Sequence, residues 1–265
     1  MIKARLLFMA LLCSMLQLSA QEKQFTGLAA LEDESSPPFN RVIEYTNFIW
    51  DNLMFSDPDS AYVLLLKAEK FAIEKDETQG LGYIYNNIGV SHGIRGNLAE
   101  SSSAFRLSSE KLLEAEDYQM YVSVMENLAH SYQQGGLWSK AISTLKKSEE
   151  YGEIHQIQYQ KDYLNEVYGR VYLGQGNLAA AKRRFFKAIT LYNPKKDSID
   201  IGTNYKYLGD IYQKENKIDS AFYFYQKSLN IHQKLSRSNA CQTTLSIGQL
   251  YFKTGQLEAA KNYLS

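Results

Sequence analysis

The sequence predicts an all-α fold, an α-solenoid of antiparallel helix pairs that follow one another at an interval of forty residues. Three kinds of position recur at this interval: one holds glycine or asparagine, one holds small residues and one holds aromatic residues. Columns that share one period are typical of a repeat protein, in which each repeat is a supersecondary unit that packs on its neighbours.

The first twenty residues have the pattern of a secretory signal peptide. Two basic residues precede an apolar run from Leu6 to about Leu18, and Ala20 supplies the small residue before the cleavage point. The run is too short to span a bilayer comfortably, and no other segment is long and apolar enough to do so. We therefore expect an exported protein, periplasmic or extracytoplasmic, with lipid modification of Cys13 as an alternative.

Cysteine content and charge limit the possible functions. Without residues 1–20 the chain keeps one cysteine, Cys241, so no disulfide can form within it and apolar packing must supply its stability. The whole chain has 29 basic and 29 acidic side chains. A surface so near neutrality gives no reason to expect a nucleic acid as a partner. Residues 21–40, which include the pair Pro37-Pro38, predict a linker.

The repeat array is expected over residues 41–265, as five helix pairs and a truncated sixth. One column falls at the turn between the two helices of a pair, where helices commonly end on a left-handed glycine or asparagine. Its members are Gly96, Gly136, Gly176, Asn216 and Gly255. The first pair has a different turn, in which we expect Asp57 to cap the second helix and Pro58 to take its first position.

Two further columns predict how the helices of a pair pack. Small residues mark places where two helices approach closely, and aromatic residues fill the space beside that contact. The small column consists of Gly89, Ala129, Gly169, Gly209 and Gly248. The aromatic column, which follows it by three residues, consists of His92, Tyr132, Tyr172, Tyr212 and Tyr251.

A glycine-rich run in the fourth pair allows another interpretation. Residues 174–179 read G-x-G-x-x-A, with Asp197 about twenty residues further on, which is the outline of a dinucleotide-binding turn. In such a turn both glycines have a role, but only Gly176 has equivalents in the other pairs. The positions equivalent to Gly174 are Ile94, Gln134, Lys214 and Lys253. We therefore predict a helix-to-helix turn without a cofactor, in which Gly174 has no particular role.

The segments Asn165–Pro194 and Tyr205–Leu229 carry the motif of the tetratricopeptide repeat (TPR) family, and the chain resembles that family from Arg41 onward. An interval of forty residues is longer than the usual one of the family. It is similar to the repeats of kinesin light chain and of bacterial sensor and regulator proteins, which also have an asparagine ahead of the small residue.

The resemblance implies a right-handed superhelix whose concave groove is lined mainly by the first helix of each pair and holds a protein or peptide. The residues that match groove positions are Tyr83, Asn86, Asn87, Glu126, Asn127, His130, Tyr163, Glu166, Arg170, Lys206 and Asp210. Amide side chains can pair with the backbone of an extended peptide, and tyrosines offer stacking area. One subtype of the family holds a C-terminal carboxylate with two lysines, an arginine and two asparagines. Only Asn127 stands at a matching place, so we do not predict this clamp.

Catalysis and metal binding are not indicated. His92 and His130 lie in neighbouring repeats, but a metal site needs three or four ligands and no cluster of His, Cys and acidic residues supplies them. Cys241 stands in no nucleophile motif and is expected to be a small packing residue. We predict neither an enzyme nor a bound cofactor or metal.

The chain ends in the first turns of an expected second helix, marked by Ala260 and Leu264, and we expect it to be a fragment or a truncated reading frame. Exported forty-residue repeats with a DPDSA segment resemble the sensor portion of membrane-bound bacterial signalling proteins. In those proteins the repeats precede a transmembrane helix and a histidine kinase or DNA-binding regulator domain. The resemblance thus implies an extracytoplasmic sensor or interaction module; the alternative is a structural scaffold in an envelope or secretion assembly.

Overall fold

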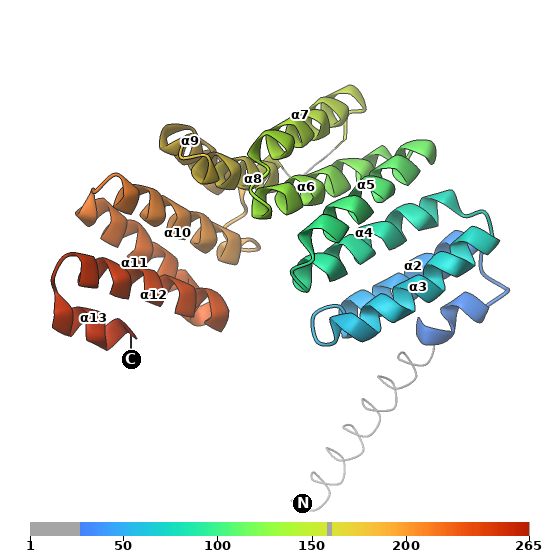
Figure 1. The fold of residues 1–265 in the computed structure, drawn as a ribbon, viewed down its shortest axis with the longest axis horizontal. Helices are drawn as coiled ribbons and strands as arrows, with labels where there is room; N and C mark the ends of the chain where they lie inside the picture. The colour runs from blue at the N-terminus through green and yellow to red at the C-terminus, as the bar shows by residue number, and fades with distance from the viewer. Residues whose placement is uncertain (1–26, 158–160, 265) are drawn as a thin grey trace, which may run out of the picture. The chain divides into compact units, whose positions relative to one another are not determined.

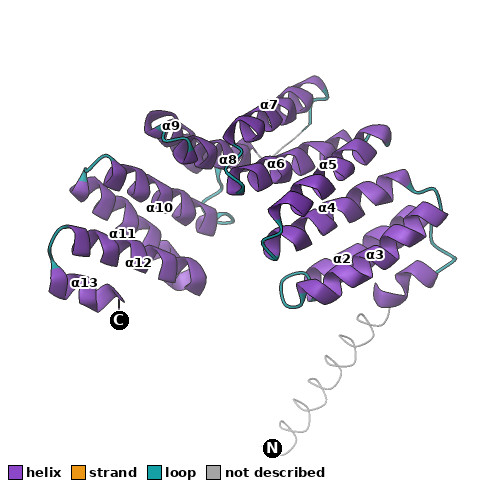
Figure 2. Cartoon of the chain, viewed as in Figure 1, coloured by secondary structure: helices purple, strands orange, loops and turns teal. Residues whose placement is uncertain are grey.

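The computed structural model describes residues 27–157 and 161–264, and the signal peptide expected at 1–20 lies outside this part of the chain. All regular elements of the described ranges are helical, which confirms the all-α prediction (Figures 1 and 2). The elements are the 3-10 helix η1 (Ala30–Glu32) and the α-helices α2 (Pro38–Asn52), α3 (Pro58–Glu74), α4 (Thr78–Ile94), α5 (Leu98–Glu114), α6 (Tyr118–Gln134), α7 (Trp138–Ile154), α8 (Lys161–Gly174), α9 (Leu178–Leu191), α10 (Ser198–Lys214), α11 (Ile218–Leu235), α12 (Arg237–Lys253) and α13 (Leu257–Leu264).

The described helices form two compact units. Unit 1 is the described part of Met1–Ser131 together with Glu150–Ile157, and unit 2 is the described part of Tyr132–Glu149 and Gln158–Ser265. Helices α6 and α7 contribute to both. Within the units consecutive helices pack as pairs, α4 on α5 in unit 1 and α8 on α9, α10 on α11 and α12 on α13 in unit 2 (Figure 1).

The left-handed turn predicted between the helices of the second to sixth pairs is confirmed. Its members all have a positive φ: Gly96 (78°), Gly136 (71°), Gly176 (78°), Gly255 (79°) and Asn216 (60°). At Gly176 an added Cβ would meet no atom within 4 Å, so glycine is favoured there by the backbone conformation and not by lack of space. The first pair behaves as expected too, because Asp57 accepts a hydrogen bond from the Ser60 N–H at 3.1 Å and Pro58 begins α3.

The small column marks close contacts between the two helices of a pair. A Cβ added to Gly169 would lie 2.6 Å from the ring of Phe185, and one added to Gly89 would lie 2.7 Å from the ring of Phe105. Real Cβ atoms do not approach other heavy atoms so closely. The glycine of the first helix therefore makes room for the aromatic ring of the second, as the spacing predicts.

Gly174 has a role that the sequence reasoning did not find. A Cβ at this position would overlap the indole ring of Trp138, which belongs to the same unit. Trp138 is the first residue of α7. The equivalent helices of the neighbouring pairs, α5 and α9, begin with leucine instead. The glycine is still no part of a phosphate loop; it makes room for an indole.

Two local expectations differ from the structure. Helix α2 begins at Pro38, inside the segment expected to be a linker, and η1 lies in that segment as well. The buried Arg41 donates a hydrogen bond to the carbonyl of Leu31, so η1 is tied to the first pair. Cys241 is exposed on α12 and is not the packing residue that we expected.

Candidate functional site

The residues that match the groove positions lie on the first helix of their pairs. Helix α4 carries Tyr83, Asn86 and Asn87; α6 carries Glu126, Asn127 and His130; α8 carries Tyr163, Glu166 and Arg170; α10 carries Lys206 and Asp210. Asn86, Glu126 and Glu166 are buried, and the others are half-buried. The buried residues can hold neighbouring side chains in place by hydrogen bonds, and the half-buried residues remain accessible to a ligand.

Amide side chains connect α4 and α6 in unit 1. The Asn127 Nδ2 donates to Asn86 Oδ1 at 3.0 Å, and the Asn86 Nδ2 donates to Asn87 Oδ1 at 3.3 Å. This chain of hydrogen bonds orients Asn87 and Asn127, whose side chains remain partly accessible. Fixed amide groups can recognise a peptide backbone without a further ordering cost.

Tyr83 is held by the loop before α6. Its hydroxyl donates to Asp117 Oδ2 at 3.1 Å, and Gln79 Nε2 donates to the same oxygen at 2.9 Å. Burial, with the negative charge of Asp117 beside it, raises the pKa of Tyr83 to about 12. Tyr83 is therefore a neutral hydrogen-bonding group at physiological pH.

Glu166 is the centre of a polar cluster in unit 2. Its Oε2 accepts hydrogen bonds from the Tyr192 hydroxyl at 3.0 Å and from Asn204 Nδ2 at 2.8 Å. Its Oε1 lies 3.8 Å from Nε of Arg170, whose guanidinium is 5.9 Å from the centre of the Tyr163 ring. Burial raises the pKa of Glu166, and the charge of Arg170 and the two hydrogen bonds oppose that shift. The cluster joins α8, α10 and the end of α9.

Lys206 and Asp210 form a second pair on α10. Lys206 Nζ lies 2.9 Å from Asp210 Oδ2, and the Tyr225 hydroxyl of α11 donates to Asp210 Oδ1 at 2.8 Å. The two charges on this surface of α10 therefore offset each other within the unit.

A pocket of about 240 Å³ opens beside the Glu166 cluster, and its lining residues are Asp162, Tyr163, Tyr192, Asp197 and Asp200. It exists because α9 ends at Leu191 and Tyr192 turns to extended backbone (φ −62°, ψ 141°). Pro194 follows, and proline cannot continue a helix. Asp197 Oδ2 accepts the Asn193 N–H at 2.8 Å, which closes the loop ahead of α10.

Of the pocket residues, the sequence reasoning found only Tyr163. Two of the others interrupt the repeat: where Asp162 and Tyr192 stand, the second pair has Gly82 and Leu112. The sequence signal for this pocket was Asp162, a charged residue in a column that otherwise holds small or apolar residues. Departures from a regular pattern concentrate at functional sites.

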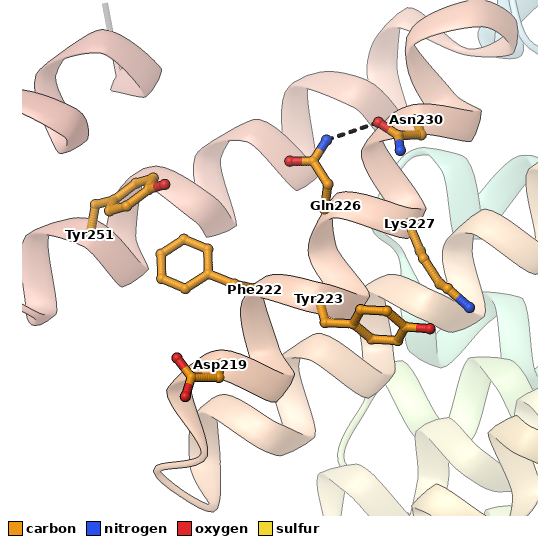
Figure 3. A pocket seen from close by; sticks show the side chains of 7 residues that line it. All are labelled: Asp219, Phe222, Tyr223, Gln226, Lys227, Asn230 and Tyr251. Carbon is orange, nitrogen blue, oxygen red and sulfur yellow. Dashed lines mark hydrogen bonds between the residues drawn. The ribbon is translucent and has the colours of Figure 1, made fainter.

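A second pocket, of about 540 Å³, lies on α11 and α12 and contains none of the predicted groove residues. Phe222 points toward Tyr251, with ring centres 4.5 Å apart (Figure 3). Gln226 Nε2 donates to Asn230 Oδ1 at 2.8 Å on the same helix. This pocket faces the solvent side of α11, where Tyr223 is 54% exposed.

Other kinds of site are not found in the described part of the chain. No group of three or more His, Cys, Asp or Glu side chains in residues 27–157 and 161–264 is arranged to hold a metal ion. Across the same ranges, no helix combines the length and the apolar character that a membrane span requires.

Comparison with known proteins bears on the fold. A family model described as a tetratricopeptide repeat matches residues 245–265, and no curated protein matches the sequence. A signal-transduction ATPase with a tetratricopeptide repeat sensor, from Pyrococcus horikoshii, is 13% identical with a TM-score of 0.66, over 88% of this chain and 36% of that one. The apo form of RapI is 13% identical with a TM-score of 0.63, over 84% of this chain and 94% of that one.

The kinesin-light-chain resemblance has a counterpart as well. Tetratricopeptide-like repeats of a Podosopora anserina protein assigned to kinesin light chain are 14% identical, with a TM-score of 0.51, over 68% of this chain and 90% of that one. Identities this low establish the fold and nothing further. Residues 245–265 of the chain therefore match a tetratricopeptide repeat model, and its described helices have the fold of tetratricopeptide repeat proteins.

Proposed function

We propose that this chain is a non-enzymatic module that binds a protein or peptide on the first helices of its pairs. We further propose that it is exported and serves as the extracytoplasmic sensor or interaction region of a bacterial signalling protein. The observation that carries the binding proposal is the Glu166 cluster, in which a buried carboxylate holds polar side chains of α8 and α10 beside an open pocket.

Physical chemistry supports a binding role for this surface. Burial of Glu166 costs free energy that a merely structural helix contact would avoid with apolar residues. The cluster instead orders Arg170 and Tyr163, two residue types that often dominate binding energy at protein interfaces. Helix-pair solenoids offer such ordered side chains along an extended surface.

A pull-down from periplasmic extract tests the binding role with matched variants. The first variant combines Asn127→Ala with Tyr163→Ala, which removes one groove candidate from each unit. The control combines Asn230→Ala with Tyr223→Ala, the same two changes at exposed positions of α11. We expect the first variant to lose partners that wild type and control recover. If all three recover the same partners, these surfaces do not bind them.

The signalling role has a separate test in the gene that encodes the chain. A transmembrane segment followed by a kinase or helix-turn-helix domain after codon 265 would support a sensor. A polar capping helix followed by a stop codon would contradict the sensor and favour the scaffold. Fractionation of cells that express the native gene tests export, since we expect the protein outside the cytoplasm.

A further inference from the structure

The pocket beside Glu166 gathers negative charge. Three of its lining side chains are carboxylates and two are tyrosines, and no basic residue is among those that line it in the described chain. Burial and the neighbouring charges of Asp197 and Asp162 raise the pKa of Asp200, as expected where like charges lie together. A cation in the pocket would relieve this repulsion.

The basic residues closest in sequence to the pocket acids, Lys161, Lys195 and Lys196, are not among its lining residues. Arg170 forms an ion pair with Glu166, whose carboxylate also accepts the hydrogen bond of the Tyr192 hydroxyl. Helix α10 has Lys206 near by in sequence, but that lysine pairs with Asp210. The pocket carboxylates therefore have no basic side chain among the lining residues, and Asp197 accepts a hydrogen bond from the Asn193 N–H.

The buried Asn204 connects the Glu166 cluster to the backbone of the pocket residue Asp200. Asn204 is completely buried, and its Nδ2 donates both to Glu166 and, at 2.8 Å, to the backbone carbonyl of Asp200. Its Oδ1 accepts no hydrogen bond from the described residues. A buried acceptor without a donor is unfavourable, and such atoms in native proteins call for an explanation. Asn204 is bonded to the backbone of the lining residue Asp200 but does not itself line the pocket.

The equivalent place in unit 1 is closed. There the Tyr83 hydroxyl donates to Asp117 at 3.1 Å, and these two residues correspond to Tyr163 and Asp197 of the pocket. Leu112 packs so tightly over Gly82 that an added Cβ would lie 2.6 Å from its side chain. In unit 2, Tyr192 stands in place of that leucine and Asp162 stands in place of that glycine. The equivalent space in unit 2 is therefore open and lined by acidic side chains.

We infer that this pocket binds the positively charged end of a lysine or arginine side chain from a basic peptide, an inference that rests on the proposed function. The volume of about 240 Å³ is more than ten times the roughly 10–15 Å³ that one water needs, so a small organic group fits. Tyrosine faces attract an organic cation in addition to the carboxylates. The described acidic side chains are not arranged as a metal site, which favours an ammonium or guanidinium group over a metal ion.

Titration calorimetry of the full chain at low salt tests this inference. The probes are an acetylated and amidated Gly-Ser-Lys-Ser-Gly peptide, its arginine analogue, the same peptide with acetyl-lysine, and free n-butylamine. We expect the lysine or arginine peptide to bind at least ten-fold more tightly than the acetyl-lysine peptide. The double change Asp162→Asn with Asp200→Asn should weaken that binding at least ten-fold. The control Asp219→Asn, an exposed acid of unit 2 on α11, should leave it unchanged.

Several results would overturn the inference. Equal affinities for the lysine and acetyl-lysine peptides would show that the pocket does not distinguish a charged from a neutral side chain. That result would leave the proposed function intact. No binding of any peptide up to millimolar concentration would reject the pocket as a site for basic side chains, while the pull-down decides on partner binding independently. If n-butylamine bound as tightly as the lysine peptide, the assignment to a peptide would be wrong. The comparison between wild-type arms holds even if the double variant does not fold.

Discussion

Replacing Glu166 by alanine is the perturbation with the largest expected effect on unit 2. The carboxylate accepts two hydrogen bonds, from Tyr192 and Asn204, and faces Arg170, whose side chain is 13% exposed. Truncation removes the acceptor of the Tyr192 hydroxyl and one of the two acceptors of Asn204 Nδ2, and it takes the ion-pair partner at 3.8 Å from the largely buried Arg170. Loss of one partner of a buried ion pair costs about 3–5 kcal/mol, and that range already includes most of the hydrogen-bond loss.

The assay must report on unit 2, because repeat proteins can unfold in segments. The chain has two tryptophans, Trp50 in unit 1 and Trp138 in unit 2, so Trp50→Phe leaves a single probe packed on Gly174. In that background, urea unfolding followed by tryptophan fluorescence at pH 7 should show that Glu166→Ala lowers the free energy of unfolding by about 3–5 kcal/mol.

Two variants frame this result. Glu166→Gln keeps an acceptor and the side-chain volume, and the raised pKa of Glu166 means that its charge is not the source of the stability, so we expect a loss of no more than about 1 kcal/mol. Asp219→Ala, at an exposed position, should change the free energy by no more than about 0.5 kcal/mol. A loss below about 1 kcal/mol for Glu166→Ala would refute the reasoning, since it would mean that Arg170 and its neighbours do not depend on the carboxylate.

Three further predictions concern packing, pH and exposure. In the same fluorescence assay, Gly169→Ala should destabilise by about 1–3 kcal/mol because its methyl group meets the Phe185 ring, and Phe185→Leu should relieve part of this loss; no loss would contradict the close contact. The raised pKa of Glu166 adds stability below its unfolded pKa that is lost as the pH rises through its folded pKa. Relative to Glu166→Gln, wild type should therefore gain stability between pH 7 and pH 5 in urea titrations, and a flat difference would contradict the shift. Cys241 should react with a thiol reagent in the native state within minutes, whereas protection until unfolding would contradict its exposure.

The fold could be predicted from the sequence because its strongest constraints are local. A turn residue with positive φ must be glycine or a tolerant substitute, and so the column with Gly176 and Asn216 locates the turns. A close helix contact likewise requires a small residue, which identifies Gly169. These constraints recur in each pair, and the period makes them visible in one sequence.

The candidate site was less accessible to the same reasoning, because it depends on a break in the period. Pro194 shortens α9, and Tyr192 then takes a position that a helical leucine occupies in α5. Sequence columns locate Tyr163 and Glu166, but they do not show that a residue beyond the end of α9 binds Glu166. Gly174 was misjudged for a related reason: its partner Trp138 begins a helix of the preceding pair, and leucine begins the equivalent helices.

The same limit explains the expectation for Cys241. Small residues in the equivalent column, such as Gly82 and Gly202, lie under side chains of a neighbouring helix. The His232 ring covers Gly202, whereas Cys241 on α12 remains exposed. Residue type alone therefore suggested burial where the surroundings do not provide it.

The central claim, that the α8 surface of unit 2 binds a partner, is tested most directly by site-specific photo-cross-linking. The photoreactive amino acid p-benzoylphenylalanine replaces Tyr163 in one protein and the exposed Tyr223 in the other, both expressed in the native compartment. The account predicts a covalent adduct of defined mass from position 163 that is lost with Asp162→Asn and Asp200→Asn, and no such adduct from position 223. An adduct that forms only at position 223, or equally at both positions, would contradict it.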